Sequence, residues 1–154
     1  MEFSNAVGMP LKDGLSFISS MVHQFNLEGN VKIIAAGKSL TAFHMIRNFG
    51  LGANIINSAR GMMLSLGCIQ ALRCHSNHCP VGITTNNPDL VAGLDVESKA
   101  ERVTNYHNET VKVVKSLLTA MGKTRPSEVK AKDIYQRQSD GTYKTFADIY
   151  QPHA

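Results

Sequence analysis

Three cysteines, Cys68, Cys74 and Cys79, carry the clearest chemical signal in this sequence. Five residues separate the first two and four separate the last two, and no other cysteine occurs among the 154 residues. Thiolates are the ligands that iron prefers in iron–sulfur clusters, and a short loop brings three of them together at little entropic cost. Because there is no fourth cysteine, a cluster lacking one iron corner fits better than a cubane with four irons.

Two other interpretations of these cysteines stay open. Zinc takes four ligands in a structural site, and His75 or His78 could complete a set with the cysteines. Ordinary buried cysteines without a ligand are the other alternative. The spacing favours an iron–sulfur cluster over both, and clustered thiols in a reducing compartment suggest a metal before a disulfide.

The second candidate site is a pair of turns, Gly37-Lys38 and Arg60-Gly61. Each follows a predicted strand and precedes a predicted helix, where backbone N–H groups and an adjacent cation attract a phosphate. Glycines that only turn the chain from strand to helix are the alternative. A nucleotide-triphosphate loop is rejected, because that motif needs a glycine at position 32, which is a lysine.

Histidines give no catalytic prediction. His23 and His44 lie within predicted amphipathic helices, where a structural imidazole is common. No histidine is paired in the sequence with a nucleophile or an acid, so the catalytic residues stay unknown. The other histidines considered are His75, His78 and His107.

The elements that must position these residues follow from the spacing of apolar side chains. A helical period predicts a helix over 10–27, ended by residues 28–30. β-Branched runs predict strands over 31–37 and 53–59. Between them we expect a helix capped by Ser39 that ends at Gly50.

The second half of the chain is predicted to be mainly helical. An apolar helix is expected over 62–72 and the longest helix over 97–121, with Gly122 as its stop. A short helix is expected from Arg125 onward, and residues 139–142 are typical of a tight turn.

Strand, helix, strand, helix is a right-handed parallel unit, in which the loops after the strands face one ligand site. Barrel enzymes commonly hold a cofactor phosphate with the loops after their last two strands. Two strands cannot make a complete barrel or a doubly wound sheet.

Composition limits the class of protein. The chain is 43% apolar and 18% charged with a net charge of +4, which is typical of a soluble globular domain rather than of disorder or fibre. Acidic residues interrupt the cations between Lys99 and Arg137, so a solvated helical face is favoured over a nucleic-acid groove. No apolar run reaches the roughly 20 residues of a membrane span, and no signal peptide is evident, so we expect a cytoplasmic protein.

Residues 58–82 resemble the signature of the FMN-binding glutamate synthase family, in the string SARGMMLSLGCIQALRCHSNHCPVG. The match joins the second turn to the three-cysteine loop in a fixed order. Ala35–Lys38 resembles the end of the seventh strand of that family, and Lys99–His107 resembles the helix after the cluster. The likeness covers essentially the whole chain.

The resemblance implies an α/β fold, namely the C-terminal portion of a (β/α)8 TIM barrel with strands seven and eight, a cluster loop and C-terminal helices. It implies that Cys68, Cys74 and Cys79 hold a 3Fe-4S cluster. It also implies that Gly37, Lys38, Arg60 and Gly61 surround the phosphate of FMN. Where the family often has paired glycines, this chain has Ala36-Gly37, and the added methyl group restricts close approach of the backbone to a phosphate.

The implied activity is that of an oxidoreductase acting on CH–NH2 donors. In that family 2-oxoglutarate and ammonia, free or derived from glutamine, form an imine that reduced FMN converts to L-glutamate by hydride transfer. The implied electron donor is ferredoxin or a reductase subunit, and no nucleic-acid partner is implied.

A complete barrel has about 250 residues, so this chain is expected to be a C-terminal fragment, inactive alone, whose missing N-terminal barrel part is its main partner. We divide it into a partial FMN-binding barrel segment (1–67), a cluster loop (68–82) and a C-terminal helical segment (83–154). Without that partner, Ile33, Ile34, Ile55 and Ile56 cannot all be covered.

A standalone iron–sulfur or zinc-binding electron-transfer module is the alternative function. The DNA upstream of Met1 separates the two. An in-frame continuation with further strand and helix units favours the enzyme fragment, whereas a ribosome-binding site after unrelated sequence favours the module.

Overall fold

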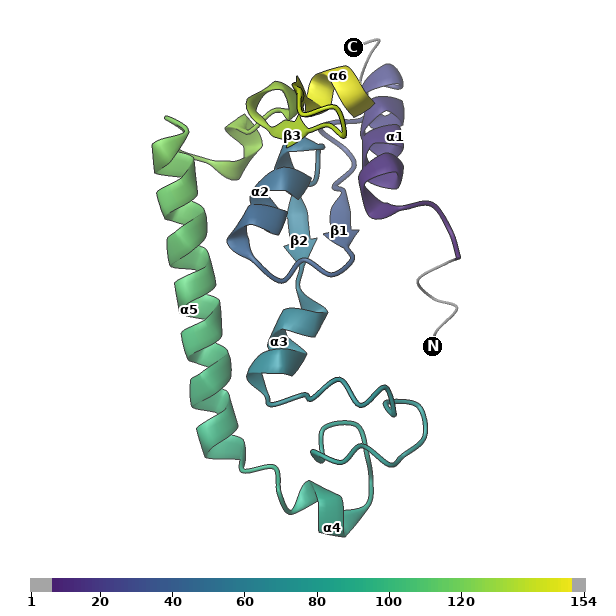
Figure 1. Ribbon diagram of the computed structural model, residues 1–154, viewed down its shortest axis with the longest axis vertical. Coiled ribbons are helices and arrows are strands. Elements are labelled where there is room, and N and C mark those ends of the chain that lie inside the picture. Colours follow the sequence, from purple (N-terminus) through teal and green to yellow (C-terminus); the bar gives the residue numbers. More distant parts are fainter. Residues whose placement is uncertain (1–6, 151–154) are drawn as a thin grey trace.

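A computed structural model describes residues 7–150 as a mixed α/β structure that is mostly helical (Figure 1). The helices are α1 (Leu11–Gln24), α2 (Ala42–Gly50), α3 (Ala59–Ser65), α4 (Pro88–Val91), α5 (Val96–Ala120) and α6 (Phe146–Tyr150), with 3-10 turns η2 (Pro126–Glu128) and η3 (Ala131–Asp133). The strands are β1 (Ile34–Ala36), β2 (Ile55–Asn57), β3 (Tyr135–Arg137) and β4 (Tyr143–Thr145). Within these residues the strands form two small sheets and no closed barrel.

Strands β1 and β2 pair in parallel, as the sequence predicts. Ile34 pairs with Ile55, and Ala36 pairs with Asn57. Each strand lies inside its predicted range and is shorter than that range. Both strands point toward α3 (Figure 1). The turns that follow the two strands therefore leave the same edge of the sheet.

Helix α1 ends earlier than predicted. Asn26 adopts a left-handed conformation with φ of 54°, and the N–H of Leu27 donates to the carbonyl of Val22. These bonds form a Schellman motif, in which a left-handed residue satisfies the last helical carbonyls. Asn26 therefore ends the helix before residues 28–30 are reached.

The N-cap of α2 is Thr41 and not the predicted Ser39. The Thr41 hydroxyl accepts the N–H of His44 at 3.4 Å, as an N-cap side chain does. Ser39 is 1% exposed, and its hydroxyl accepts a hydrogen bond from Asn48 Nδ2 at 2.9 Å. Its side chain is thus committed to the interior of the turn and is not available as a cap.

Helix α3 has seven residues and does not continue to position 72 as predicted. Gly67 has φ of 102°, its N–H donates to Leu64, and the N–H of Cys68 donates to Met63. This Schellman motif ends the helix at Ser65, and its left-handed glycine lies one residue before the first cysteine. The apolar period beyond Gly67 therefore does not indicate a helix, and the cysteines lie in a loop.

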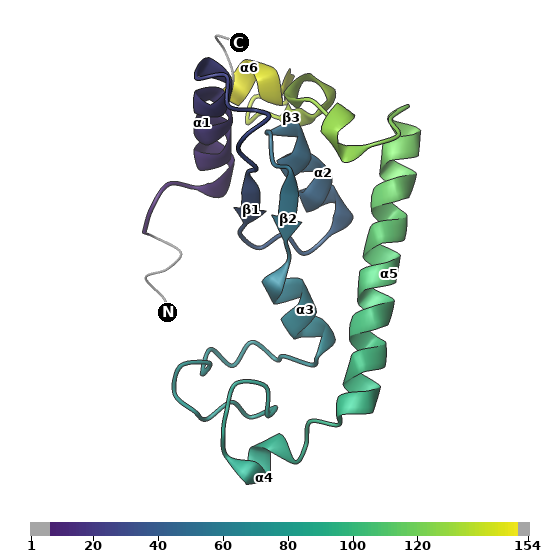
Figure 2. The ribbon, with the colours of Figure 1, turned by 180° about the vertical axis from the view of Figure 1, so that it is seen from behind.

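Helix α5 confirms the prediction of a long helix, with 25 residues ended by Gly122 at φ of 67°. It runs alongside α2 and α3, from the cysteine loop to the opposite end of the strand pair (Figure 2). Ile46, Leu118 and Val129 form the buried cluster that attaches its C-terminal part to α2.

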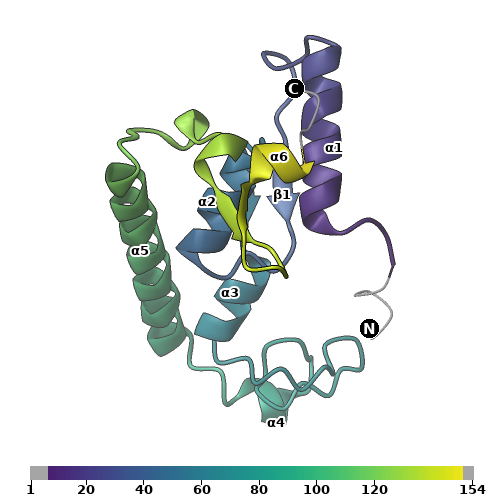
Figure 3. The ribbon, with the colours of Figure 1, turned by 45° about the horizontal axis from the view of Figure 1, so that its top comes forward.

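The C-terminal residues form an antiparallel hairpin of β3 and β4 that the sequence analysis did not predict beyond its turn. Asp140 Oδ1 accepts the N–H of Thr142 at 2.9 Å, and Gly141 has φ of 84°. The short expected helix after Arg125 is the 3-10 turn η2. The hairpin and α6 cover the end of the strand pair opposite α3 (Figure 3).

The main buried cluster lies between α1, β1, the C-terminal end of α2 and α6. Its members are Leu15, Ala35, Leu51, Ala53, Ala131 and Phe146. Ile33 and Ile56 pack against it, whereas Ile34 is 60% exposed and Ile55 is 50% exposed. This confirms that the chain does not cover all four strand isoleucines. No helix of residues 7–150 is long and apolar enough to cross a membrane.

Candidate functional site

The two predicted turns lie at one edge of the strand pair, because the carboxyl ends of parallel strands meet at the same edge. Lys38 is the second residue after β1 and has φ of 51°, a left-handed conformation uncommon for a side chain of its size. Arg60 lies in the first turn of α3, and both cationic side chains are exposed. The chain thus brings two cations to the same edge.

The turn after β1 is held in place by side chains of two other elements. Asn48 of α2 is fully buried and donates to the Ser39 hydroxyl. The Ser58 hydroxyl, which precedes α3, donates to the Ser39 carbonyl at 2.5 Å. Buried hydrogen bonds of this kind fix a loop because breaking one leaves a polar group without a partner. The two turns are therefore joined to each other directly.

Tyr106 of α5 packs onto the second turn. Its hydroxyl donates to the Leu40 carbonyl at 2.8 Å and lies 3.5 Å from the Ser58 hydroxyl. A Cβ atom added to the buried Gly61 would lie 2.0 Å from this tyrosine oxygen. Glycine at position 61 is thus required for the contact between α3 and α5, whatever else it does there.

The three cysteines line one small cavity of about 10 Å³ in the loop after α3. Cys68 is half-buried, Cys74 is exposed, and Cys79 is 8% exposed. Within residues 7–150, no group of three or more His, Cys, Asp or Glu side chains is arranged to hold a metal ion. A cluster bound by these thiols must therefore widen the cavity.

Backbone N–H groups stabilise the thiolate form of Cys79. Hydrogen bonds from the backbone of Thr84, and then of Val81, lower the pKa of Cys79 to about 7, although burial raises it. The N–H of Gln70 lies 3.4 Å from the Cys68 sulfur, to which it donates. Thiolate is the form of cysteine that binds metals, so these bonds favour ligation.

The loop backbone is irregular and is held by specific contacts. Gln70 and Leu72 have φ of 57° and 56°, a region in which residues other than glycine carry a cost of order 1 kcal/mol. The Asn77 side chain accepts the N–H of Asn86 at 2.7 Å and folds the loop back on itself. Gly82 has φ of 77°, and a Cβ atom there would lie 2.4 Å from the Leu90 carbonyl. Only glycine fits at this position.

Positive charge lies beside the start of the cysteine loop. A Cβ atom built on Gly67 would be 3.3 Å from Lys99 Nζ and 3.7 Å from Arg102 Nη1. These cations of α5 therefore lie at the C-terminal end of α3, where they complement its free carbonyls. The histidines of the zinc alternative are both exposed, and His78 Nδ1 lies 2.6 Å from the Ser76 carbonyl.

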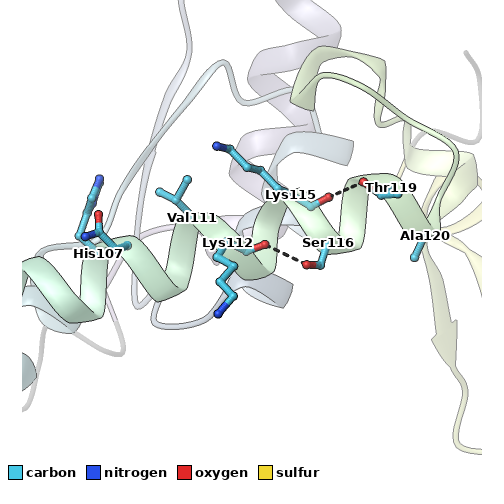
Figure 4. Close-up of a pocket in the computed structure, with 8 residues that line it drawn as sticks. His107, Val111, Lys112, Lys115, Ser116, Thr119 and Ala120 are labelled. Carbon is cyan, nitrogen blue, oxygen red and sulfur yellow. Dashed lines mark hydrogen bonds between the residues drawn. The ribbon is translucent and has the colours of Figure 1, made fainter.

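Two further hollows involve α5. An apolar one of about 590 Å³ lies between α2, β2 and α5, with Phe49 and Val114 in its wall. Another lies along the outer face of α5, where the hydroxyls of Ser116 and Thr119 donate to carbonyls four residues earlier (Figure 4). Neither hollow is lined by the cysteines or by the cations Lys38 and Arg60, although the apolar one reaches Ser58 and Ala59 beside the second turn.

The chain has a mixed α/β fold and a loop that carries three cysteines. Its sequence shows the family to which it belongs. The chain belongs to the glutamate synthase family, because the family model described as a conserved region in glutamate synthase matches residues 1–124. This confirms the resemblance on which the sequence analysis relied.

Several curated proteins named as glutamate synthases, or as similar to them, resemble this chain in sequence. The glutamate synthase large subunit-like protein YerD of Bacillus subtilis is 38% identical over 141 residues, which are 92% of this chain and 27% of YerD. The archaeal glutamate synthase (NADPH) of Methanocaldococcus jannaschii is 31% identical over 78% of this chain and 24% of its own length. The glutamate synthase (NADH) of Schizosaccharomyces pombe is 29% identical over 75% of this chain and 5% of its own. The chain thus spans about a quarter of the length of the first two.

Sequence reasoning missed the hydrogen bonds that join the turns. The sequence predicts Ser39 as a helix cap, Ser58 in the second turn and Tyr106 on the face of the long helix, and it indicates no contact among them or with Asn48. One signal was present, because Asn48 interrupts the apolar positions of α2. A buried amide needs partners, so its position pointed to a polar contact beneath the first turn.

Proposed function

We propose that this chain is the part of a glutamate synthase-type oxidoreductase that holds the phosphate of FMN and a 3Fe-4S cluster. In this proposal β1 and β2 are the seventh and eighth strands of a (β/α)8 barrel. The observation that carries it is that α3 alone connects the two cationic turns to the cysteine loop. Its seven residues span about 10 Å, so the two sites are neighbours.

The phosphate is assigned to Gly37, Lys38, Arg60 and Gly61. The parallel pairing and the Ser58 hydrogen bond support this assignment because they hold both turns at one edge. Lys38 and Arg60 supply charge for a dianionic group, and hydrogen bonds to charged groups are stronger than neutral ones. Ala36, which stands where the family often has a glycine, does not remove either cation, Lys38 or Arg60, from this edge.

The cluster is assigned to Cys68, Cys74 and Cys79. The donor set fits, because three thiols share one cavity and two of the sulfurs accept backbone N–H groups. The left-handed conformations of Gln70 and Leu72 support a binding role, since strained backbone persists where the surroundings or a ligand hold it. These cysteines lie in the proposed cluster loop (68–82), between the proposed barrel segment (1–67) and the C-terminal helical segment (83–154).

The activity belongs to the whole protein. FMN, when bound, supplies hydride transfer to the imine of 2-oxoglutarate and ammonia, with ferredoxin or a reductase subunit as the source of electrons. The residues of this chain hold the cofactor phosphate and the cluster, and the remaining barrel strands supply the substrate contacts. Three cysteines that hold a cluster and form no disulfide are suited to the cytoplasm.

Metal analysis of the chain and three variants tests this function. After anaerobic reconstitution with iron and sulfide, we expect broad visible absorption, with iron and acid-labile sulfide in a ratio of about three to four. Cys74→Ser should lower the iron content sharply, whereas His75→Ala and His78→Ala should leave it unchanged. Binding of one zinc without sulfide, lost in a histidine variant, would establish the zinc module instead.

A further inference from the structure

The hydroxyl groups of Ser58 and Tyr106 link the turn after β1 to the second turn and to α5. Tyr106 donates to the Leu40 carbonyl at 2.8 Å, and Ser58 donates to the Ser39 carbonyl at 2.5 Å. Each hydroxyl has one proton, so both are fully committed as donors. The two oxygens are 3.5 Å apart, which places both bonds in one small region.

These bonds fix the orientation of two successive peptide groups. All peptide bonds of the described residues are trans, so each C=O points away from the N–H of the next residue. Turning the carbonyls of Ser39 and Leu40 toward the two hydroxyls directs the following N–H groups to the other side. The N–H of Leu40 accordingly faces His44 Nδ1 at 3.4 Å.

The orientation matters for an anion at this edge. A carbonyl oxygen carries partial negative charge and repels a phosphate, whereas an N–H group attracts it. With Ser58 and Tyr106 in place, the carbonyl oxygens of Ser39 and Leu40 are engaged in hydrogen bonds at the second turn and are not available to face an anion held by Lys38 and Arg60. Without them, these oxygens would be free to turn toward the phosphate.

The position of Tyr106 is itself fixed. The absence of a side chain on Gly61 leaves the space that the tyrosine oxygen occupies. Tyr106 is half-buried on α5, ten residues after Val96, so it reaches the turn from the helix that follows the cysteine loop. Its contact is therefore made by a segment distant in sequence from both turns.

We infer that Tyr106, together with Ser58, is a positioning residue for the phosphate site: its hydroxyl holds the turn after β1 in the form that accepts the phosphate of FMN. This inference rests on the proposed function and adds to it a residue outside the two turns. Tyr106 does not touch the phosphate and acts through the peptide groups of residues 39–41.

Binding of FMN and of riboflavin, which lacks the phosphate, tests the inference. Both dissociation constants are measured by flavin fluorescence for the chain and for Tyr106→Phe, which keeps the ring and removes only the hydroxyl. We expect the affinity for FMN to fall about fivefold, the effect of one neutral hydrogen bond, and that for riboflavin to stay unchanged. Ser58→Ala should give the same selective loss while leaving the hydrogen bond from Tyr106 to the Leu40 carbonyl in place.

Tyr143→Phe is the matched control, because Tyr143 lies 66% exposed on the hairpin and should affect neither ligand. Equal losses for both flavins, or no loss in either variant, would overturn the inference while leaving the phosphate site intact. A wild-type chain with no preference for FMN over riboflavin refutes the phosphate site itself. Thermal unfolding of each variant shows that the fold is retained, and Ser58→Ala decides the question if Tyr106→Phe unfolds.

Discussion

At the scale of single residues, the charge of the two turns and their packing depend on different side chains. Lys38 and Arg60 provide the charge at the strand edge, and Gly61 provides the space that Tyr106 fills. The cysteines show a similar division, because Cys79 is buried and stabilised as a thiolate while Cys74 is exposed. Ligand binding and packing thus depend on different side chains and can be tested apart.

Removing either cation should weaken FMN binding. Lys38→Ala and Arg60→Ala are each expected to reduce the affinity at least tenfold, because a charged hydrogen bond to phosphate contributes about 1.5–3 kcal/mol. The comparison is best made by equilibrium titration in a complete homologous barrel, with Lys32→Ala as the control for a cation before the strand. Retention of flavin in both turn variants would reduce the turns to structural elements.

Gly61→Ala should destabilise the fold. The added methyl group would meet the Tyr106 and Ser58 hydroxyls, and overpacking of this kind costs about 1–3 kcal/mol. Chemical denaturation measures the loss. Gly29→Ala is the control, because a Cβ atom there has no neighbour within 4 Å, and equal stability of the two variants would contradict the packing.

At the scale of elements, the positions of the helices and strands depend on the residues that end them. The Schellman motifs at Asn26, Gly67 and Gly122 set the ends of α1, α3 and α5. The motif at Gly67 has a direct functional consequence, since it delivers Cys68 into the loop one residue later. The C-terminal segment is tied to the residues that follow α5 through Asp133, whose carboxylate lies 3.2 Å from Lys123 Nζ.

Asp133→Asn should lower the free energy of unfolding by about 1 kcal/mol at neutral pH. The N–H of Lys130 donates to the Asp133 carboxylate, and this bond, with Lys123, holds its pKa below the ordinary value. The lowered pKa of Asp133 stabilises the fold at pH values above about 4, which is the pKa of an aspartate in the unfolded chain. This stabilisation is lost as the pH falls through the pKa of Asp133 in the folded protein.

The measurement is urea unfolding of both proteins at pH 7 and at acidic pH. The difference in stability should shrink as the pH drops below about 4. Glu109→Gln serves as the control, because its ion pair with Lys112 is exposed and contributes little. A difference between Asp133→Asn and the wild type that is independent of pH would contradict the assignment.

The sequence was sufficient to predict the helices and strands whose apolar residues recur at regular spacing. It was insufficient to predict the contacts between these elements. The long helix and both parallel strands follow from apolar spacing, and the cysteine loop follows from the family resemblance. The apolar residues after Gly67 suggested more helix than is present, because periodicity does not register a left-handed glycine. The hairpin of β3 and β4 was missed, since strands of three residues give little alternation.

The partners of Ser39, Ser58 and Tyr106 could not be predicted for another reason. They join segments 19 and 66 residues apart, and their hydrogen bonds depend on tertiary packing. No local pattern distinguishes a tyrosine that packs on a turn from one that only lines a helix. The prediction of Ser39 as a cap was wrong because Asn48, nine residues later on α2, donates to its hydroxyl.

At the scale of the whole molecule, this chain leaves apolar surface uncovered. Ile34 and Ile55 are half or more exposed on the strand pair, and within residues 7–150 β1 and β2 pair only with each other. An unpaired strand edge next to apolar side chains promotes association. The family match, and the fact that this chain spans about a quarter of the length of YerD, support the proposal that further units of a longer protein cover this surface.

The chain alone should therefore associate. We expect oligomers in sedimentation velocity, binding of an apolar reporter dye, and no flavin oxidation that depends on 2-oxoglutarate, even with FMN supplied. Ile34→Lys with Ile55→Lys should reduce both the association and the dye signal, whereas Val96→Lys, at an exposed valine on α5, should not. A monomer with cooperative unfolding and a high Tm would raise the standalone module above the enzyme fragment.

The most direct test of the central claim is the electron paramagnetic resonance spectrum of the reconstituted chain. A cluster held by Cys68, Cys74 and Cys79 alone lacks its fourth iron, so the oxidised protein should give the signal of a three-iron cluster, and Cys79→Ser should abolish it. The same signal should persist in His75→Ala. A spectrum without this signal in the oxidised protein, together with tight binding of a single zinc ion, would contradict the account.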